Sequence, residues 1–179
     1  MRRVSVIGTS GSGKSTLAAA LAVALGADLL ELDSVYHQAG WERLPTEEFR
    51  RRVASVVAGE RWVIDGNNSE VQDLVWGRAD TVVWLDLPRR TVMRRIIRRS
   101  FRRVARRVEL WNGNREHWRN LLTRISWAWQ THAANRVKYE AAMADPGNSH
   151  LRFVRLASPA AVRRFLSAAS RSASGRDEL

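Results

Sequence analysis

Residues 8–15 read Gly-Thr-Ser-Gly-Ser-Gly-Lys-Ser, and this run constrains the fold more than any other part of the sequence. Its glycines, followed by lysine and serine, have the spacing of a loop whose backbone N–H groups wrap around phosphates. The β-branched run Val4–Ile7 precedes the loop, and Ser15–Leu25 follows it with helical character and stops at Gly26. The sequence therefore predicts a strand, a phosphate-binding loop and a helix in direct succession.

This loop predicts a nucleotide site with magnesium. Lys14 is expected to reach the β and γ phosphates of ATP, and the Ser15 hydroxyl is expected to bind Mg²⁺, with Thr16 beside it on the first helical turn. The predicted nucleotide-binding residues are Gly8, Thr9, Ser10, Gly11, Ser12, Gly13, Lys14, Ser15 and Thr16.

Short apolar runs alternate with helical patterns along the rest of the chain. The expected strands are Val4–Ile7, Leu29–Leu32, Trp62–Ile64, Thr81–Leu87 and Leu151–Leu156. The expected helices are Ser15–Leu25, Thr46–Gly59 with Thr46 as its cap, Thr91–Val108, His117–Met143 and Pro159–Ala169. Such alternation predicts an α/β fold with a parallel, doubly wound sheet.

A nucleotide site with magnesium also needs a carboxylate close to the ion. Asp65 and Asp86 each end an apolar strand, and ligands of open α/β sheets gather beyond the carboxyl ends of the strands. The residues alone leave both open as the magnesium-linked carboxylate. An equally simple interpretation of Asp86, which precedes Leu87-Pro88, is a loop cap.

A third carboxylate, Asp33, ends the second strand and should point into the same crevice. It is followed by a loop that carries Tyr36, His37 and Trp41. A carboxylate there would orient or deprotonate the hydroxyl of a phosphate acceptor. The alternative is a loop-capping aspartate beside core aromatic residues.

The second half of the chain carries the excess positive charge. Residues 88–179 hold 21 of the 30 Lys and Arg but only 6 of the 18 Asp and Glu. Pairs of arginines repeat every four residues from Arg94 to Arg107, and a polar break follows at residues 112–114. Most of these arginines fit a solvated helix face, whereas Arg107 or Arg115 near the break would contact the transferring phosphoryl group. The charge also admits nucleic acid as a partner.

The composition and the first residues of the chain exclude several classes of protein. The chain has no cysteine, which excludes disulfides and thiolate chemistry, and its first apolar run is too short for a signal peptide or a membrane span. We expect a cytoplasmic protein without membrane contact, with one domain over residues 1–169 and a disordered tail over residues 170–179.

Four segments together resemble a known family. The phosphate loop, Leu32-Asp33 with Tyr36 and Gly40-Trp41, the run from Trp62 to Asn67, and Trp84 to Pro88 resemble the bacterial DNA topology modulation proteins. These are similar to the adenylate-kinase-like nucleoside and nucleotide kinases. The resemblance covers roughly residues 1–165.

The resemblance implies a three-layer P-loop NTPase fold whose five-stranded sheet has the order 2-3-1-4-5. It places Asp65 near magnesium, in preference to Asp86, and implies a short lid at about residues 108–117 with Arg115 as its phosphate contact. Adenylate kinases continue Asp-Gly with Phe-Pro-Arg, whereas Asp65-Gly66 continues with Asn67-Asn68-Ser69, so the nucleotide-gripping arginine is missing.

The favoured function is transfer of the γ-phosphoryl group of ATP to an unidentified small-molecule or nucleotide acceptor. The predicted catalytic residues are Lys14, Asp33, Asp65 and Arg115, and the predicted metal ligands are Ser15 and Asp65. The alternative is a nucleotide-dependent P-loop ATPase that binds nucleic acid through the arginine-rich half.

Overall fold

The computed structural model describes residues 1–105, 109–114 and 121–174. Its centre is a five-stranded, wholly parallel sheet with the strand order β2-β3-β1-β4-β5. The strands are β1 (Arg3–Gly8), β2 (Asp28–Glu31), β3 (Trp62–Asp65), β4 (Thr81–Leu85) and β5 (Arg152–Leu156). The predicted α/β fold class and strand order are both confirmed.

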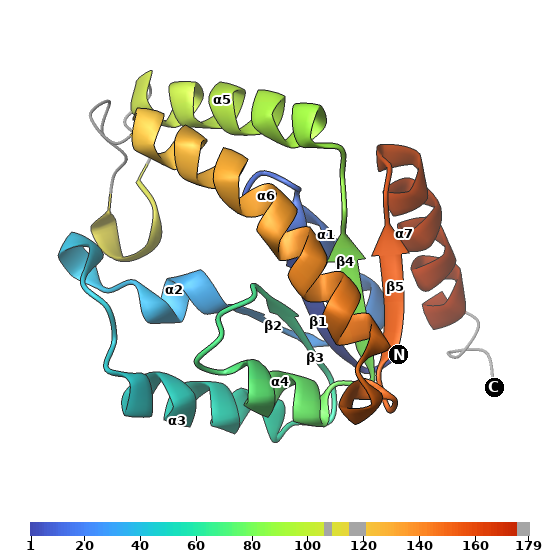
Figure 1. The fold of residues 1–179 in the computed structure, drawn as a ribbon. Helices are drawn as coiled ribbons and strands as arrows, with labels where there is room; N and C mark the ends of the chain where they lie inside the picture. The colour runs from blue at the N-terminus through green and yellow to red at the C-terminus, as the bar shows by residue number, and fades with distance from the viewer. Residues whose placement is uncertain (106–108, 115–120, 175–179) are drawn as a thin grey trace.

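Helices cover both faces of this sheet and make three layers (Figure 1). The helices are α1 (Lys14–Leu25), α2 (Leu32–Tyr36), α3 (Thr46–Val57), α4 (Gln72–Arg78), α5 (Arg89–Ala105), α6 (Leu121–Ala144) and α7 (Pro159–Ser174). Single 3-10 turns, η1 (Ala39–Trp41), η2 (Trp111–Gly113) and η4 (Pro146–Asn148), join some of them. None of the described helices is long and apolar enough to cross a membrane.

The central strands explain why the sheet is buried on both sides. In β1, Val4 and Val6 pack with α1 and α7, while Ile7 points to the opposite face and packs with α3 and α4. Successive side chains of a strand alternate between its faces, so continuous apolar runs require cover on both. α6 crosses this second face, where Tyr139 packs edge to face on Trp84 (Figure 1).

A third, smaller apolar cluster holds α5 beside α6. Leu87, Val92, Met93 and Ile96 pack there with Ala128 of α6. This packing decides which face of the arginine-rich helix α5 is turned inward, and it places α5 above the carboxyl edge of the sheet (Figure 1).

Several local predictions need correction. Asp33 lies in the first turn of the short helix α2 instead of following a strand directly, and α4 has no counterpart in the predicted elements. Thr46 is the first residue of α3, not its cap, and its hydroxyl donates to Glu70. Residues 170–174, predicted to be disordered, continue α7, because Phe165, Leu166 and Ala169 pack the helix on α1 and the sheet.

Candidate active site

The glycine loop has a backbone that side chains would obstruct. Gly8, Gly11 and Gly13 all have positive φ angles, of 148°, 77° and 100°. A Cβ atom on Gly8 would lie 2.8 Å from the main-chain oxygen of Leu85, and one on Gly11 would lie 2.4 Å from Cγ1 of Ile96. The loop therefore wraps closely at the N-terminus of α1, where backbone N–H groups and the helix dipole favour an anion.

Lys14 stands in this loop with its ammonium group directed to the loop's own backbone. Its Nζ donates to the main-chain oxygen of Thr9 at 3.3 Å. Burial lowers the pKa of Lys14, and the negative charges of Asp65 and Asp33 partly oppose this shift. The lysine thus lies between the phosphate loop and both predicted carboxylates.

Asp65 ends β3 and is only 7% exposed. Burial raises the pKa of its carboxyl, while Lys14 and a hydrogen bond with the Ser15 side chain lower it. Its Oδ1 atom is buried and has no hydrogen-bond partner among the residues that the structure describes. A buried carboxylate oxygen without a partner fits a cation ligand, since burying it otherwise costs free energy.

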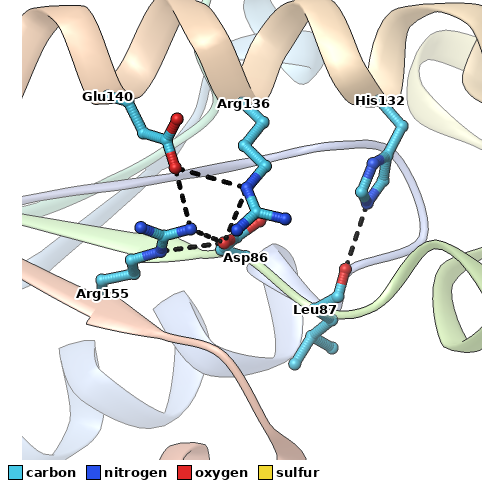
Figure 2. Close-up of polar contacts among 6 residues, drawn as sticks. All are labelled: Asp86, Leu87, His132, Arg136, Glu140 and Arg155. Atoms are coloured by element: carbon cyan, nitrogen blue, oxygen red, sulfur yellow. Dashed lines mark hydrogen bonds and ion pairs between the residues drawn. The ribbon is translucent and has the colours of Figure 1, made fainter.

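Asp86, the other candidate for the magnesium-linked carboxylate, forms ion pairs with arginines away from the phosphate loop. Its carboxylate accepts hydrogen bonds from Arg155 of β5, at 2.8 Å from Nε, and lies 3.6 Å from Nε of Arg136 (Figure 2). Arg155 also pairs with Glu140 and lies over the ring of Trp84. Asp86 therefore joins β4 to β5 and α6, and this arrangement supports Asp65 as the carboxylate of the site.

Asp33 is exposed and faces the cavity from α2. Its charge affects the pKa of both Lys14 and Asp65, so the three groups lie close together. The rings of Tyr36, His37 and Trp41 follow it and line the same cavity. The structure places all four side chains around one cavity, with Asp33 carried by α2, and their role in acceptor binding stays a prediction.

One cavity of about 940 Å³ connects all of these groups. It runs along the carboxyl edge of the sheet, where the loop after β1 occupies the middle. On the β5 side it is lined by Pro159, Val162, Arg163 and Leu166 of α7, and on the β2 side by Asp33, Tyr36, His37 and Trp41. The cavity is thus divided by the phosphate loop into two halves.

Two arginines that sequence reasoning assigned to a solvated face contact the phosphate loop. Arg95 donates to the main-chain oxygen of Ser12 at 2.8 Å, and Arg99 donates to Oγ of Ser10 at 3.0 Å. Arg102 and Arg103 line the cavity as well. Arg95, Arg99 and Arg103 follow one another at the predicted four-residue spacing, which places them on nearly the same side of α5.

Arg90, Arg94 and Arg98 form an exposed outer stripe on α5, while Arg89 donates to the main-chain oxygen of Trp129 in α6. This stripe belongs to the surface predicted for nucleic acid, and such binding stays a prediction. Arg107 and Arg115, predicted to touch the phosphoryl group, lie outside the described residues, as do the ends of the predicted lid.

The described part of that lid, residues 109–114, contacts the β2 half of the cavity. Asn112 and Asn114 bond to the backbone of residues 34–41, and Trp111 lines the cavity beside them. The described segment thus reaches the predicted acceptor side, and the phosphate contact that the resemblance implied stays a prediction, because it belongs to Arg115 outside the described residues.

Neither a family model nor a curated protein sequence matches this chain. Solved structures do. A gluconokinase from Sinorhizobium meliloti 1021 is similar with a TM-score of 0.50 and 19% identity, over 97% of this chain and 94% of that one. A shikimate kinase from Acinetobacter baumannii, in complex with shikimate, has a TM-score of 0.51 and 18% identity, over 94% and 90%.

A deoxyadenosine kinase from M. mycoides is similar to the same degree, with a TM-score of 0.51 and 13% identity over 96% of this chain and 98% of that one. The fold is therefore that of the P-loop kinases for nucleotides and small molecules. The finer resemblance to the DNA topology modulation proteins stays a prediction.

Proposed function

We propose that this protein is a kinase that transfers the γ-phosphoryl group of ATP to a hydroxyl-bearing acceptor. The observation that carries the proposal is a continuous cavity in which the phosphate loop separates an arginine- and α7-lined half from a carboxylate- and aromatic-lined half. A nucleotide bound in the first half would direct its terminal phosphate toward an acceptor in the second. A protein that only binds or hydrolyses nucleotide has no need of the second half.

The phosphate end of the site is built for negative charge. Backbone N–H groups of residues 8–15, the N-terminus of α1 and the Lys14 ammonium surround the place where β and γ phosphates would lie. Arg95 and Arg99 are fixed against this loop by their hydrogen bonds. Such preorganised donors stabilise the charge that moves between oxygens during phosphoryl transfer.

Ser15 and Asp65 would hold Mg²⁺ at this site. The partnerless Oδ1 of Asp65 and its hydrogen bond with the Ser15 side chain fit that role. In the described part of the chain no three His, Cys, Asp or Glu gather into a metal site, which suits an ion that takes most of its ligands from phosphates and water. When bound, the ion neutralises charge on the phosphates.

Asp33 is the proposed acceptor-activating group. It is exposed to the cavity and close to Lys14, so a hydroxyl placed between it and the γ phosphate would have its proton directed to the carboxylate. The acceptor oxygen then forms a bond to phosphorus while the bond to the ADP oxygen breaks. Lys14 stays with the phosphates throughout.

An acceptor screen tests the proposal. ADP formation from MgATP would be measured with gluconate, shikimate, deoxynucleosides and nucleotides, for the natural sequence and for Lys14→Ala. We expect one class to raise turnover well above slow hydrolysis and Lys14→Ala to abolish the increase. Lys138, the only other lysine, is exposed on α6, so Lys138→Ala is the matched control. An unchanged rate in Lys14→Ala, or no acceptor dependence in a broad screen, contradicts the kinase proposal.

A further inference from the structure

Two loops that are distant in sequence are joined on the β2 side of the cavity. Oδ1 of Asn114 accepts from the backbone N–H of Trp41 at 2.9 Å. Its Nδ2 atom donates to the main-chain oxygens of Gln38 at 2.8 Å and of Trp111 at 2.9 Å. Asn114 is only 4% exposed. Both the oxygen and the nitrogen of its carboxamide bond to the loop 38–41, so Asn114 connects that loop with residues 110–114.

A second asparagine strengthens this connection. Nδ2 of Asn112 donates to the main-chain oxygen of His37 and, at 3.3 Å, to that of Ser34. The loop 110–114 also closes on itself, because the N–H of Leu110 donates to the main-chain oxygen of Asn114 at 2.7 Å. The side-chain bonds of Asn112 and Asn114 thus attach the loop 110–114 to residues 34–41 on the acceptor side of the cavity.

The same junction contains backbone strain. Trp41 has a φ angle of 63° and Asn112 one of 55°, and they are the non-glycine residues with positive φ in the described ranges. This left-handed conformation is disfavoured for a side chain as bulky as tryptophan, and it persists where the surrounding structure enforces it. Both strained residues belong to the two loops that the asparagines join.

The result is a pair of indole side chains at one end of the cavity. Trp41 and Trp111 both line it. Nε1 of Trp111 donates to Oε2 of Glu31 at 2.9 Å, and the ring of Trp41 meets that of His37 edge to face at 5.5 Å between centroids. Asn67, Asn68 and Asn135 line the cavity too and offer amide donors and acceptors. Asp33 lies on this same side.

We propose that Asn114 is a positioning residue that fixes Trp41 and Trp111 as one wall of the acceptor site, and that the acceptor carries a ring whose face lies on this wall. Its reactive hydroxyl is directed to Asp33. This inference rests on the proposed kinase function and names the chemical class of its acceptor. A ring offers a flat apolar face to an indole and polar edges to the asparagines, whereas an open chain offers no such face.

Ligand binding measured by tryptophan fluorescence tests this inference separately from turnover. Saturating MgADP would occupy the nucleotide half, and deoxyadenosine, shikimate and open-chain gluconate would be titrated in turn. Signal from Trp41 would be isolated by comparison with Trp41→Phe, since the chain has eight tryptophans. We expect at least one ring compound to bind at least 10-fold more tightly than gluconate. Deoxyadenosine and shikimate distinguish a planar base from a carbocycle, and preference for either supports the inference.

Single-residue variants test whether Trp41 and Asn114 account for the binding of the ring compound. We expect Asn114→Ala and Trp41→Leu to weaken binding of the ring compound at least 10-fold, with MgADP affinity changed less than 2-fold and Trp41→Phe retaining most of the binding. Asn148→Ala is the control, because Asn148 makes a similar bond to the main-chain oxygen of Ala142, remote from the cavity. Circular dichroism confirms that each variant is folded, and Trp41→Leu provides the test if Asn114→Ala is not.

Three outcomes overturn the inference. The first is that gluconate binds more tightly than either ring compound. The second is that the ring compound binds equally well to the natural sequence, Asn114→Ala and Trp41→Leu, and the third is that none of the three compounds binds. If gluconate also supports ADP formation, the proposed kinase function stands while the ring-bearing acceptor is rejected. If ring compounds bind but no compound of the acceptor screen supports ADP formation, the wall stands and the kinase function fails.

Discussion

The guanidinium of Arg95 donates a hydrogen bond to the main-chain oxygen of Ser12 across 83 positions of sequence, at 2.8 Å. Through this bond, helix α5 holds the phosphate loop from outside, and Arg99 adds a bond to Ser10 one turn later. The loop geometry therefore depends on a helix that the local motif does not contain.

This relationship predicts a selective loss of nucleotide affinity. We expect Arg99→Ala to weaken MgATP binding roughly 10- to 100-fold, because a charge-assisted hydrogen bond contributes about 1.5–3 kcal/mol. Arg98→Ala on the outer stripe is the matched control and should change affinity less than about 2-fold, since an exposed arginine adds little. Isothermal titration calorimetry measures both. Equal losses in the two variants would show that net charge alone matters.

Asp65 and Asp86 should respond oppositely to substitution. We expect Asp86→Ala to lower the free energy of unfolding by about 2 kcal/mol, below the roughly 3–5 kcal/mol of a fully buried pair because Arg136 and Arg155 are partly exposed. Nucleotide affinity should persist. Asp65→Asn should remove magnesium-dependent activity while changing stability by less than about 1 kcal/mol, since burial cost and attraction to Lys14 oppose each other. Urea denaturation measures the stability of both variants, and ADP formation measures their activity. Loss of activity in Asp86→Ala together with loss of stability in Asp65→Asn would make Asp86 the functional carboxylate.

The raised pKa of Asp65 predicts how pH affects the site. Burial raises this pKa above its ordinary 3.8, so the native state binds the proton more tightly, and the group's contribution to stability falls as pH rises through the folded value. Magnesium needs the ionised carboxylate. The gain in ATP affinity that Mg²⁺ gives should therefore be lost, on lowering pH, earlier than for an ordinary aspartate.

Titrations of ATP with and without Mg²⁺ between about pH 4 and pH 8 measure that gain. Asp65→Asn is the control and should show a small gain without this pH dependence. A gain in the natural sequence that stays constant down to about pH 4 would count against a magnesium role for Asp65.

Two glycines offer a matched test of loop geometry. Gly8→Ala should destabilise the fold by at least about 2 kcal/mol, since φ is 148° and the new Cβ would lie 2.8 Å from the backbone oxygen of Leu85. Gly77 lies in α4 with open space around it, so Gly77→Ala should stabilise by about 0.5–1 kcal/mol. Thermal and urea denaturation compare the two. A neutral Gly8→Ala would mean that the loop relaxes without cost.

The sequence by itself determined the phosphate loop, the apolar strands and the three carboxylates, because each follows from a local pattern. Gly8 to Ser15 has a spacing that few backbones satisfy, and short β-branched apolar runs such as Thr81–Leu85 favour a strand buried on both faces. The short helices α2 and α4 escaped prediction, since so few residues give no clear period.

The tertiary structure distinguishes residues that look equivalent in the local sequence pattern. The strands β3, which contains Asp65, and β4, which precedes Asp86, both lie beside the phosphate-loop strand β1. The outer neighbour of β4 is β5, where Arg155 pairs with Asp86, whereas the outer neighbour of β3 is β2, which carries no arginine. Likewise, packing of Val92 and Ile96 on α6 turned Arg95 and Arg99 inward. A residue's neighbours across the sheet and between helices are set by chain topology, and no window of sequence contains them.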